Sequence, residues 1–163
     1  MLNNDLGRGG NGFTIVEVII VVVVVGILAS IFIATDSTSM ARGRDSERSS
    51  DVKNIARQFE SYYRRYPTAK GATYPSSAQM TESALLKIIT DRELLIPPGQ
   101  STPSFKIATS KYPQTPTKDE YIYQPLDDKG DLCTGSTPCA RFFIYYKKET
   151  ENNTSFVYSM RQQ

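Results

Sequence analysis

Hydrophobic and polar positions divide the chain near residue 35. From Phe13 to Ala34 nearly every residue is apolar and Glu17 is the only charged one, whereas the sequence beyond Thr35 is polar and rich in tyrosine. As a helix, the apolar run would be about 33 Å long at about 1.5 Å per residue, enough to cross a hydrocarbon core of about 30 Å. A helix is expected there because its backbone polar groups bond to one another. The sequence therefore predicts a membrane-spanning helix over residues 13–34.

A helical period resumes in the polar part of the chain. After a Ser-, Arg- and Asp-rich stretch over residues 35–50, apolar residues recur at steps of three and four. These residues are Val52, Ile55, Ala56, Phe59, Tyr62, Tyr63 and Tyr66. The spacing places them on one face of a helix, which Pro67 ends. We therefore expect one helix from about Phe13 to Tyr66, apolar all round at first and amphipathic over 35–66.

Residues 67–163 carry the signals of a small globular head. A helical spacing with Thr81 as N-cap predicts a short helix over 81–95, and the prolines between 97 and 119 indicate an irregular loop. Aromatic and β-branched runs predict three strands, at 120–124, 140–147 and 155–160. The fold class is therefore α+β, with the long helix packed on a small antiparallel sheet so that each covers the apolar face of the other.

Composition narrows the classes of function. The chain has 163 residues, a net charge of +2, and neither His nor Trp. Without His, Ser–His and Cys–His nucleophile pairs and His-ligated zinc sites are excluded. No other catalytic or metal-binding constellation is evident in the sequence. It therefore indicates a membrane-tethered structural or binding protein, not an enzyme, and implies no cofactor.

Glu17 is the most informative residue of the apolar run. A carboxylate in a membrane span is costly, so it implies a partner unless it lies at the membrane edge. Glu17 follows Phe13 by four residues, which puts both on one helix face. Cleavage between Gly12 and Phe13 would give Phe13 a free α-amino group. This ammonium is the natural counter-ion for Glu17, within one subunit or between neighbours.

The segment Gly12-Phe13-Thr14-Ile15-Val16-Glu17, followed by the long apolar run, resembles the class III signal of type IV pilins and pseudopilins. The resemblance extends over about Arg8 to Ile33. It implies a leader peptide over residues 1–12, cleavage after Gly12 by a prepilin peptidase, and N-methylation of Phe13. It also implies that Glu17 pairs with the N-terminal amine of an adjacent subunit and sets the register of a helical filament. Gly26 occupies the family's helix-weakening position, so any stretch that melts on assembly should centre there.

Charges beside the apolar run give conflicting signals on orientation. Arg8 favours a cytoplasmic N-terminus, whereas Arg42, Arg44 and Arg48 after the run favour the reverse. The resemblance decides for a single-pass protein of the inner (cytoplasmic) membrane, N-in and C-out, that becomes an extracellular filament on assembly. The partners it implies are further copies of the chain, the prepilin peptidase, the pilus assembly platform and the membrane.

Basic residues outnumber acidic ones between Ala41 and Lys70. Lys or Arg stands at 42, 44, 48, 53, 57, 64, 65 and 70, and Asp or Glu at 45, 47, 51 and 60. Such clusters attract nucleic-acid phosphates. A solvated helix face that meets opposite charges on neighbouring subunits is the favoured explanation.

Two further groups in the head carry candidate chemistry. If the head lies outside the cytoplasm, Cys133 and Cys139 are expected to form a disulfide that stiffens the loop between the first two strands. A disulfide at this place resembles the one that closes a loop near the C-terminus in many pilins. Asp127, Asp128 and Asp131 form an acidic cluster of the kind that can bind Ca²⁺, as some pseudopilins do, although a solvated turn is favoured.

These features together predict a structural subunit of a type IV pilus-like filament, or fimbrium. Adhesion, surface motility and DNA uptake are the tasks that the resemblance implies. A pseudopilin of a type II-like secretion system is the alternative; the disulfide favours the pilin and the acidic cluster the pseudopilin. A third hypothesis is a single-pass membrane-anchored binding module, which would retain Met1 and tolerate Glu17→Ala.

Overall fold

The computed structural model describes residues 12–65, 67–68, 71–135 and 137–161, except for the side chains of 32–37, 67–68 and 71–72. The predicted leader up to Asn11, the predicted last helical residue Tyr66, and Lys70 lie outside this part. The chain divides into two compact units, Met1–Ser39 and Met40–Gln163. The long predicted helix is confirmed as α1 (Ile15–Arg65), which begins in the first unit and ends in the second.

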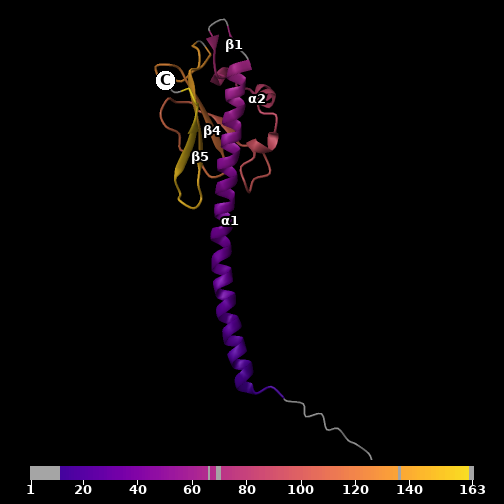
Figure 1. Ribbon diagram of the computed structural model, residues 1–163. Helices are drawn as coiled ribbons and strands as arrows, with labels where there is room; N and C mark the ends of the chain where they lie inside the picture. The colour runs from indigo at the N-terminus through magenta and orange to yellow at the C-terminus, as the bar shows by residue number, and fades with distance from the viewer. Residues whose placement is uncertain (1–11, 66, 69–70, 136, 162–163) are drawn as a thin grey trace, which may run out of the picture. The chain divides into compact units, whose positions relative to one another are not determined.

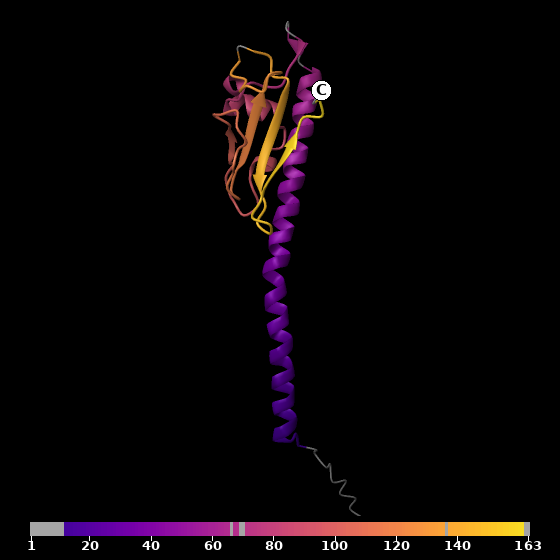
Figure 2. The ribbon, with the colours of Figure 1, turned by 90° about the vertical axis from the view of Figure 1, so that its left-hand side faces the viewer.

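The second unit is an α+β fold, as the sequence predicts (Figure 1). Its sheet has four strands in the order β3-β4-β5-β6. They are β3 (Phe105–Ile107), β4 (Tyr121–Leu126), β5 (Arg141–Lys147) and β6 (Thr154–Tyr158). The last three match the predicted strands to within two residues at each end and pair in antiparallel fashion. Figure 2 shows them running alongside the C-terminal part of α1.

Strand β3 corrects two predictions. It lies in the segment 97–119, which was expected to be irregular, and it pairs with β4 in parallel, so the sheet is mixed and not purely antiparallel. This segment forms a strand because its side chains alternate as Phe105-Lys106-Ile107. The alternation turns the two apolar side chains to the core face, beside Tyr121 and Tyr123. Three residues are too few for the period of two to be recognised among prolines.

Smaller elements connect α1 to the sheet. A short hairpin, β1 (Pro67–Thr68) with β2 (Gly71–Ala72), follows α1, and a 3₁₀ turn, η1 (Ser77–Gln79), comes next. The helix predicted over 81–95 is wrong in extent, because α2 (Glu82–Ile88) is followed by a separate 3₁₀ turn, η2 (Arg92–Leu95).

The ends of α2 explain this division. The hydroxyl of Thr81 accepts a hydrogen bond from the Ala84 amide at 3.3 Å, which confirms the predicted N-cap. At the other end, Ile89 is extended and buried, and the amide of Thr90 donates to the side chain of Gln58 at 2.9 Å. Burial of Ile89 and this tertiary hydrogen bond replace the next helical turn.

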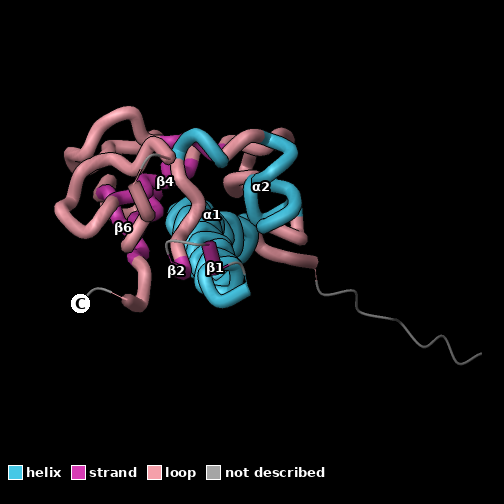
Figure 3. The backbone as a smooth tube through the Cα atoms, turned by 90° about the horizontal axis from the view of Figure 1, so that it is seen from above, coloured by secondary structure: helices cyan, strands magenta, loops and turns pink. Residues whose placement is uncertain are grey.

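The core of the second unit lies between α1 and the sheet. Helix α1 contributes Val52, Ile55, Ala56 and Phe59, and the strands contribute Tyr121, Tyr123, Phe142, Ile144 and Tyr146. The ring of Phe59 lies 4.6 Å from that of Tyr123 and 5.5 Å from that of Phe142, between centroids. Viewed from above, β6 and α2 lie on different sides of α1 (Figure 3). The predicted amphipathic face of the helix is therefore the one that carries the sheet.

Candidate functional site

The N-terminal motif lies where α1 begins. Gly12 and Phe13 precede the helix without regular secondary structure, and both are exposed, Phe13 at 82%. The peptide bond between them therefore lies outside the hydrogen-bonded helix. A peptidase that binds an extended segment would not have to unwind α1 to reach it.

Thr14 caps the first turn of the helix. Its hydroxyl accepts a hydrogen bond from the backbone amide of Glu17 at 3.3 Å, which satisfies one of the amides left free at a helix start. Thr14 and Glu17 have the Thr-x-x-Glu spacing of a capping box. The sequence holds this signal, and it would have placed the start of the helix two residues after Phe13.

Glu17 lies in the first turn of α1 and is exposed. A carboxylate at this end of a helix interacts favourably with the helix dipole. Among the residues that the structure describes, Glu17 has no ion pair.

The first turns of α1 expose apolar side chains all round. The large aliphatic side chains of this segment are each between 49% and 78% exposed. They are Ile15, Val16, Val18, Ile19, Ile20, Val21, Val22, Val23, Val24, Val25, Ile27, Leu28 and Ile31. A helix that is apolar on every side is one that other molecules cover.

The predicted span over 13–34 includes residues 32–34, whose side chains lie outside the described part. Within the described part of the chain, no helix combines the length and the apolar character that crossing a membrane requires.

Gly26 lies inside α1. A Cβ added there would meet nothing within 4 Å, so packing within one copy does not require glycine at this position. Glycine in a helix interior destabilises the helix by roughly 0.5–1 kcal/mol relative to alanine. The residue thus provides a weak point in an otherwise continuous helix.

A partly buried group of charges holds the turn between β5 and β6 to α1. It consists of Arg44, Asp45, Arg48 and Glu149, and we call it the Arg48 cluster. The guanidinium of Arg48 is 1% exposed and lies 3.0 Å from Asp45 and 2.5 Å from Glu149, between nitrogen and oxygen. Arg44 contacts the second oxygen of Glu149 at 2.7 Å. The cluster joins residues more than 100 positions apart, which is why no pattern in the sequence predicts it.

The carboxylates of the Arg48 cluster are held in their charged forms. Hydrogen bonds from Arg44 and then Arg48, opposed by burial, lower the pKa of Glu149 to about 2. Burial is the largest single effect on Asp45 and raises its pKa, but hydrogen bonds from Glu149 and Thr150 outweigh it, so that the pKa is lowered. Those bonds come from the amide of Glu149 at 2.8 Å and from the amide and hydroxyl of Thr150 at 3.0 and 2.7 Å.

The basic stretch from Ala41 to Lys70 is partly neutralised within the chain. Arg44 and Arg48 are both paired with Glu149, and Arg48 is also paired with Asp45. These ion pairs reduce the positive charge that is free to bind a phosphate backbone.

The surroundings of Asp51 raise the pKa of its carboxyl group, whereas those of Glu149 lower the pKa. Asp51 accepts a hydrogen bond from the hydroxyl of Tyr121 at 3.1 Å, and the carboxylates of Glu47 and Asp91 are close enough to repel its negative charge. Burial, aided by repulsion from these two carboxylates, raises the pKa of Asp51 to about 6 although the Tyr121 bond opposes it.

A disulfide joins Cys133 to Cys139, with their Cα atoms 5.6 Å apart, in the loop between β4 and β5 as the sequence predicts. Both cysteines are buried. The amide of Ser77 donates to the carbonyl of Cys133 at 2.9 Å, and that of Tyr74 donates to the carbonyl of Cys139 at 3.0 Å. The disulfide loop is thus fixed to the segment that follows the β1–β2 hairpin.

The three aspartates of the acidic cluster do not converge. A side-chain oxygen of Asp127 accepts hydrogen bonds from the amides of Lys129 and Asp131, and Asp131 pairs with Lys111 at 2.7 Å. Asp128 is exposed. In the described ranges, no group of three or more His, Cys, Asp or Glu side chains is arranged to hold a metal ion.

Comparison with known proteins identifies the N-terminal segment. Residues 8–33 match the family model described as the prokaryotic N-terminal methylation motif. The chain therefore carries a class III signal peptide of the type IV pilin kind. No curated protein and no solved structure matches the chain. The motif supports a precursor of the pilin or pseudopilin type and indicates a structural protein.

Proposed function

We propose that this chain, with its class III signal peptide, is the precursor of a structural subunit of a type IV pilus-like filament. Prepilin peptidase cleaves it after Gly12, and the new N-terminus at Phe13 is methylated. The apolar part of α1 anchors the subunit in the inner membrane and then packs in the filament core. The head forms the filament surface, outside the cell.

The observation that carries this proposal is the methylation motif on a helix whose apolar side chains are exposed on every side. Covering a half-exposed Val, Ile or Leu side chain gains about 1 kcal/mol, so covering the whole set gains on the order of 10 kcal/mol. Lipid supplies that cover before assembly, and the same helices of neighbouring copies supply it afterwards.

Glu17 supplies the specificity that apolar packing lacks. Contacts between valine and isoleucine side chains are similar at many axial offsets, so they select no single register. A carboxylate surrounded by apolar side chains is stable only where a cation meets it. The methylated amine of Phe13 in an adjacent copy is such a cation, and one offset brings the two together.

The test is the intact mass of the protein in a fraction sheared from the cell surface. We expect the mass of a chain that begins at N-methylated Phe13 and has lost two hydrogens to a disulfide. A processed chain found only in the membrane would replace the pilus subunit by a pseudopilin. A chain that still begins at Met1 would leave the membrane-anchored binding module.

The structure removes one argument for the pseudopilin. The acidic cluster favoured it as a Ca²⁺ site, but Asp131 is paired with Lys111 and Asp127 binds backbone amides. The disulfide, which favours the pilin, is left as the difference in head chemistry, and the location of the mature chain is the property that separates the two hypotheses by experiment.

A further inference from the structure

Four aromatic side chains form one connected group on strands β5 and β6. They are Phe143, Tyr145, Phe156 and Tyr158, and we call them the aromatic cluster. Neighbouring rings lie between 5.6 and 6.4 Å apart, centroid to centroid. Because each ring is held by others, the group is rigid and would lose little conformational freedom on binding a partner.

The aromatic cluster lies on the face of the sheet opposite the core. Phe143 is paired with Tyr158, and Tyr145 with Phe156, whereas Ile144 and Val157 between them contact the core. Phe156 and Tyr158 are each 52% exposed, and they lie on β6, which is an edge strand. Exposed aromatic groups of this size at a sheet edge are typical of interaction surfaces.

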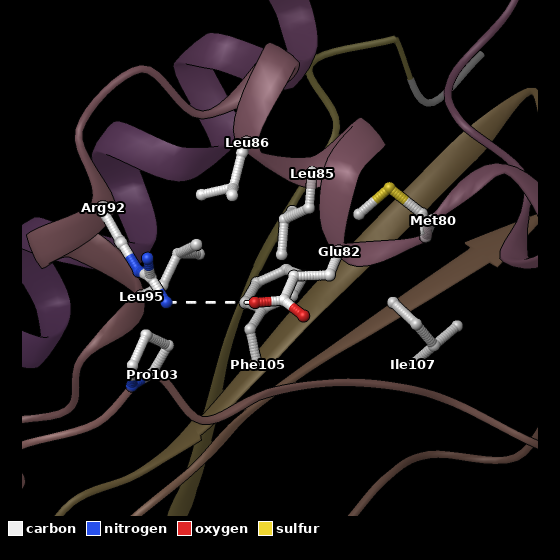
Figure 4. Close-up of a pocket in the computed structure, with 9 residues that line it drawn as sticks. All are labelled: Met80, Glu82, Leu85, Leu86, Arg92, Leu95, Pro103, Phe105 and Ile107. Atoms are coloured by element: carbon white, nitrogen blue, oxygen red, sulfur yellow. Dashed lines mark ion pairs between the residues drawn. The ribbon is translucent and has the colours of Figure 1, made fainter.

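A pocket with apolar and charged lining residues lies beside the other edge of the same sheet, between β3 and α2. We call it the α2 pocket; it has a volume of about 360 Å³. Its lining consists of Met80, Glu82, Leu85, Leu86, Arg92, Leu95, Pro103, Phe105 and Ile107. Figure 4 shows the side chains of Glu82 and Arg92 meeting among these apolar residues, 3.8 Å apart. Both are largely exposed, so this pair does not close the pocket.

The aromatic cluster and the α2 pocket cannot meet within one copy. They lie at opposite edges of the sheet, with β4 and β5 between β3 and β6. Neighbouring strands are about 4.8 Å apart, so the two edges are separated by about 14 Å. A patch and a pocket on different sides of one molecule can make a head-to-tail contact, which repeats as a ring where its rotation closes and as an open helical filament where it does not.

We propose that the aromatic cluster of one copy inserts Phe156 and Tyr158 into the α2 pocket of the next copy. This inference rests on the proposed function, because it identifies a contact between heads of the assembled filament. The partner is thus a second copy of this chain and not a ligand or another protein.

Size and charge support this occupant. A cavity of about 150 Å³ holds one benzene ring, so about 360 Å³ accommodates the two rings of Phe156 and Tyr158. Lys147 lies next to the cluster on β5 and has no ion pair in the part of the chain that the structure describes. Glu82 is paired with Arg92 in the pocket lining, whereas Glu93 on η2 is exposed and has no ion pair among the described residues. Lys147 and Glu93 thus place opposite charges beside the two surfaces.

Cross-linking between differently tagged copies tests the contact. Thr154→Cys is exposed beside the cluster, and Ser83→Cys is exposed beside the pocket, so neither change removes a contact residue. The native cysteines are joined and do not react with a maleimide. We expect a short bismaleimide to join T154C of one copy to S83C of another in sheared filaments. Lys129→Cys, in the exposed turn between β4 and β5, is the control and should give no such adduct.

Substitutions at the contact should abolish the adduct. Phe156→Ala on the cluster and Leu86→Arg on the pocket should each reduce it about tenfold or more, because buried aromatic anchors dominate interfaces. Tyr112→Ala removes an aromatic side chain that is 69% exposed and lies outside the cluster, and it should have no effect. Unchanged membrane levels and protease resistance of each variant show that its head is folded.

The outcomes separate the two proposals. Sheared filaments without the T154C–S83C adduct, or with adducts only between two T154C copies or to another protein, overturn the head contact and leave the proposed function intact. If the chain is absent from sheared fractions, the proposed function fails. The T154C–S83C adduct is then measured in membrane fractions. Its presence there still supports the contact between heads, and its absence overturns that contact.

Discussion

Replacing Glu149 by glutamine tests whether the Arg48 cluster stabilises the head. Glutamine keeps the size of the side chain and removes its charge, so Arg48 keeps only Asp45 as a carboxylate partner. A pKa lowered from 4.5 to about 2 corresponds to about 3 kcal/mol at about 1.4 kcal/mol per unit. Glu149 is 17% exposed, and solvent screening reduces this value. We expect E149Q to lower the free energy of unfolding by about 1–2 kcal/mol at pH 7.

The pH dependence follows from the direction of the shift. Because folding lowers the pKa of Glu149, its stabilisation is present above pH 4.5 and is lost as the pH falls towards about 2. The difference in stability between the natural chain and E149Q should therefore shrink over this window. Asp45 is also held charged and remains in the variant, so some acid sensitivity persists in both proteins.

Urea unfolding of the full chain in detergent micelles measures this difference. Near-ultraviolet circular dichroism follows the tyrosines of the core, and the chain has no tryptophan to obscure them. With a urea dependence of about 1–3 kcal/mol per molar, the expected loss moves the midpoint by about 1 M. Glu151→Gln is the matched control, since its pair with Lys148 is exposed and contributes under about 1 kcal/mol. Equal midpoints for both variants at pH 7 would refute a stabilising role for the cluster.

Three further predictions concern the N-terminus, the buried acid and the disulfide. Glu17→Ala should leave the protein in the membrane but reduce the yield of sheared filaments about tenfold or more. Glu47→Ala, at an exposed position of the same helix, is the control and should not reduce the yield. A normal filament yield from Glu17→Ala would contradict the role of Glu17 in setting the register. The raised pKa of Asp51 destabilises the folded head as the pH rises from 3.8 to about 6, and the loss is complete above that pH. Asp51→Asn should therefore raise stability by about 1 kcal/mol at pH 7 and have no effect at pH 3. Urea midpoints at the two pH values check this, and an equal gain at both would contradict it. Replacing both cysteines by serine should cost about 2 kcal/mol, and an unchanged midpoint would show that the disulfide does not stabilise the head.

The sequence predicts those parts of the fold that have a strong local pattern. The amphipathic part of helix α1 could be placed by apolar residues at steps of three and four, and strands β4, β5 and β6 by their runs of aromatic and β-branched residues. Val52, Ile55 and Phe59 were expected on one helix face, and all three are fully buried. The N-terminal motif could be recognised because its residues are contiguous.

Features that depend on contacts between distant residues could not be predicted. Strand β3 is stabilised by pairing with β4, and three residues carry too little pattern of their own. The end of α2 is set by the burial of Ile89 and by Gln58 on α1. Arg48 looks like any solvent-facing residue of a basic helix until Glu149, about a hundred positions later, is placed beside it. Tertiary contacts decide each of these cases.

The Arg48 cluster also has a consequence for the order in which the chain is made. Arg44, Asp45 and Arg48 leave the ribosome about a hundred residues before Glu149 and Thr150, so Arg48 has only Asp45 as a carboxylate partner while most of the head is being synthesised. Until then Arg48 and Asp45 must remain hydrated, because a charged group that lacks part of its partners is costly to bury. The head can therefore pack fully against α1 only after the β5–β6 hairpin has been synthesised. A chain truncated before Glu149 would retain an open, hydrated helix face that quality-control proteases can bind.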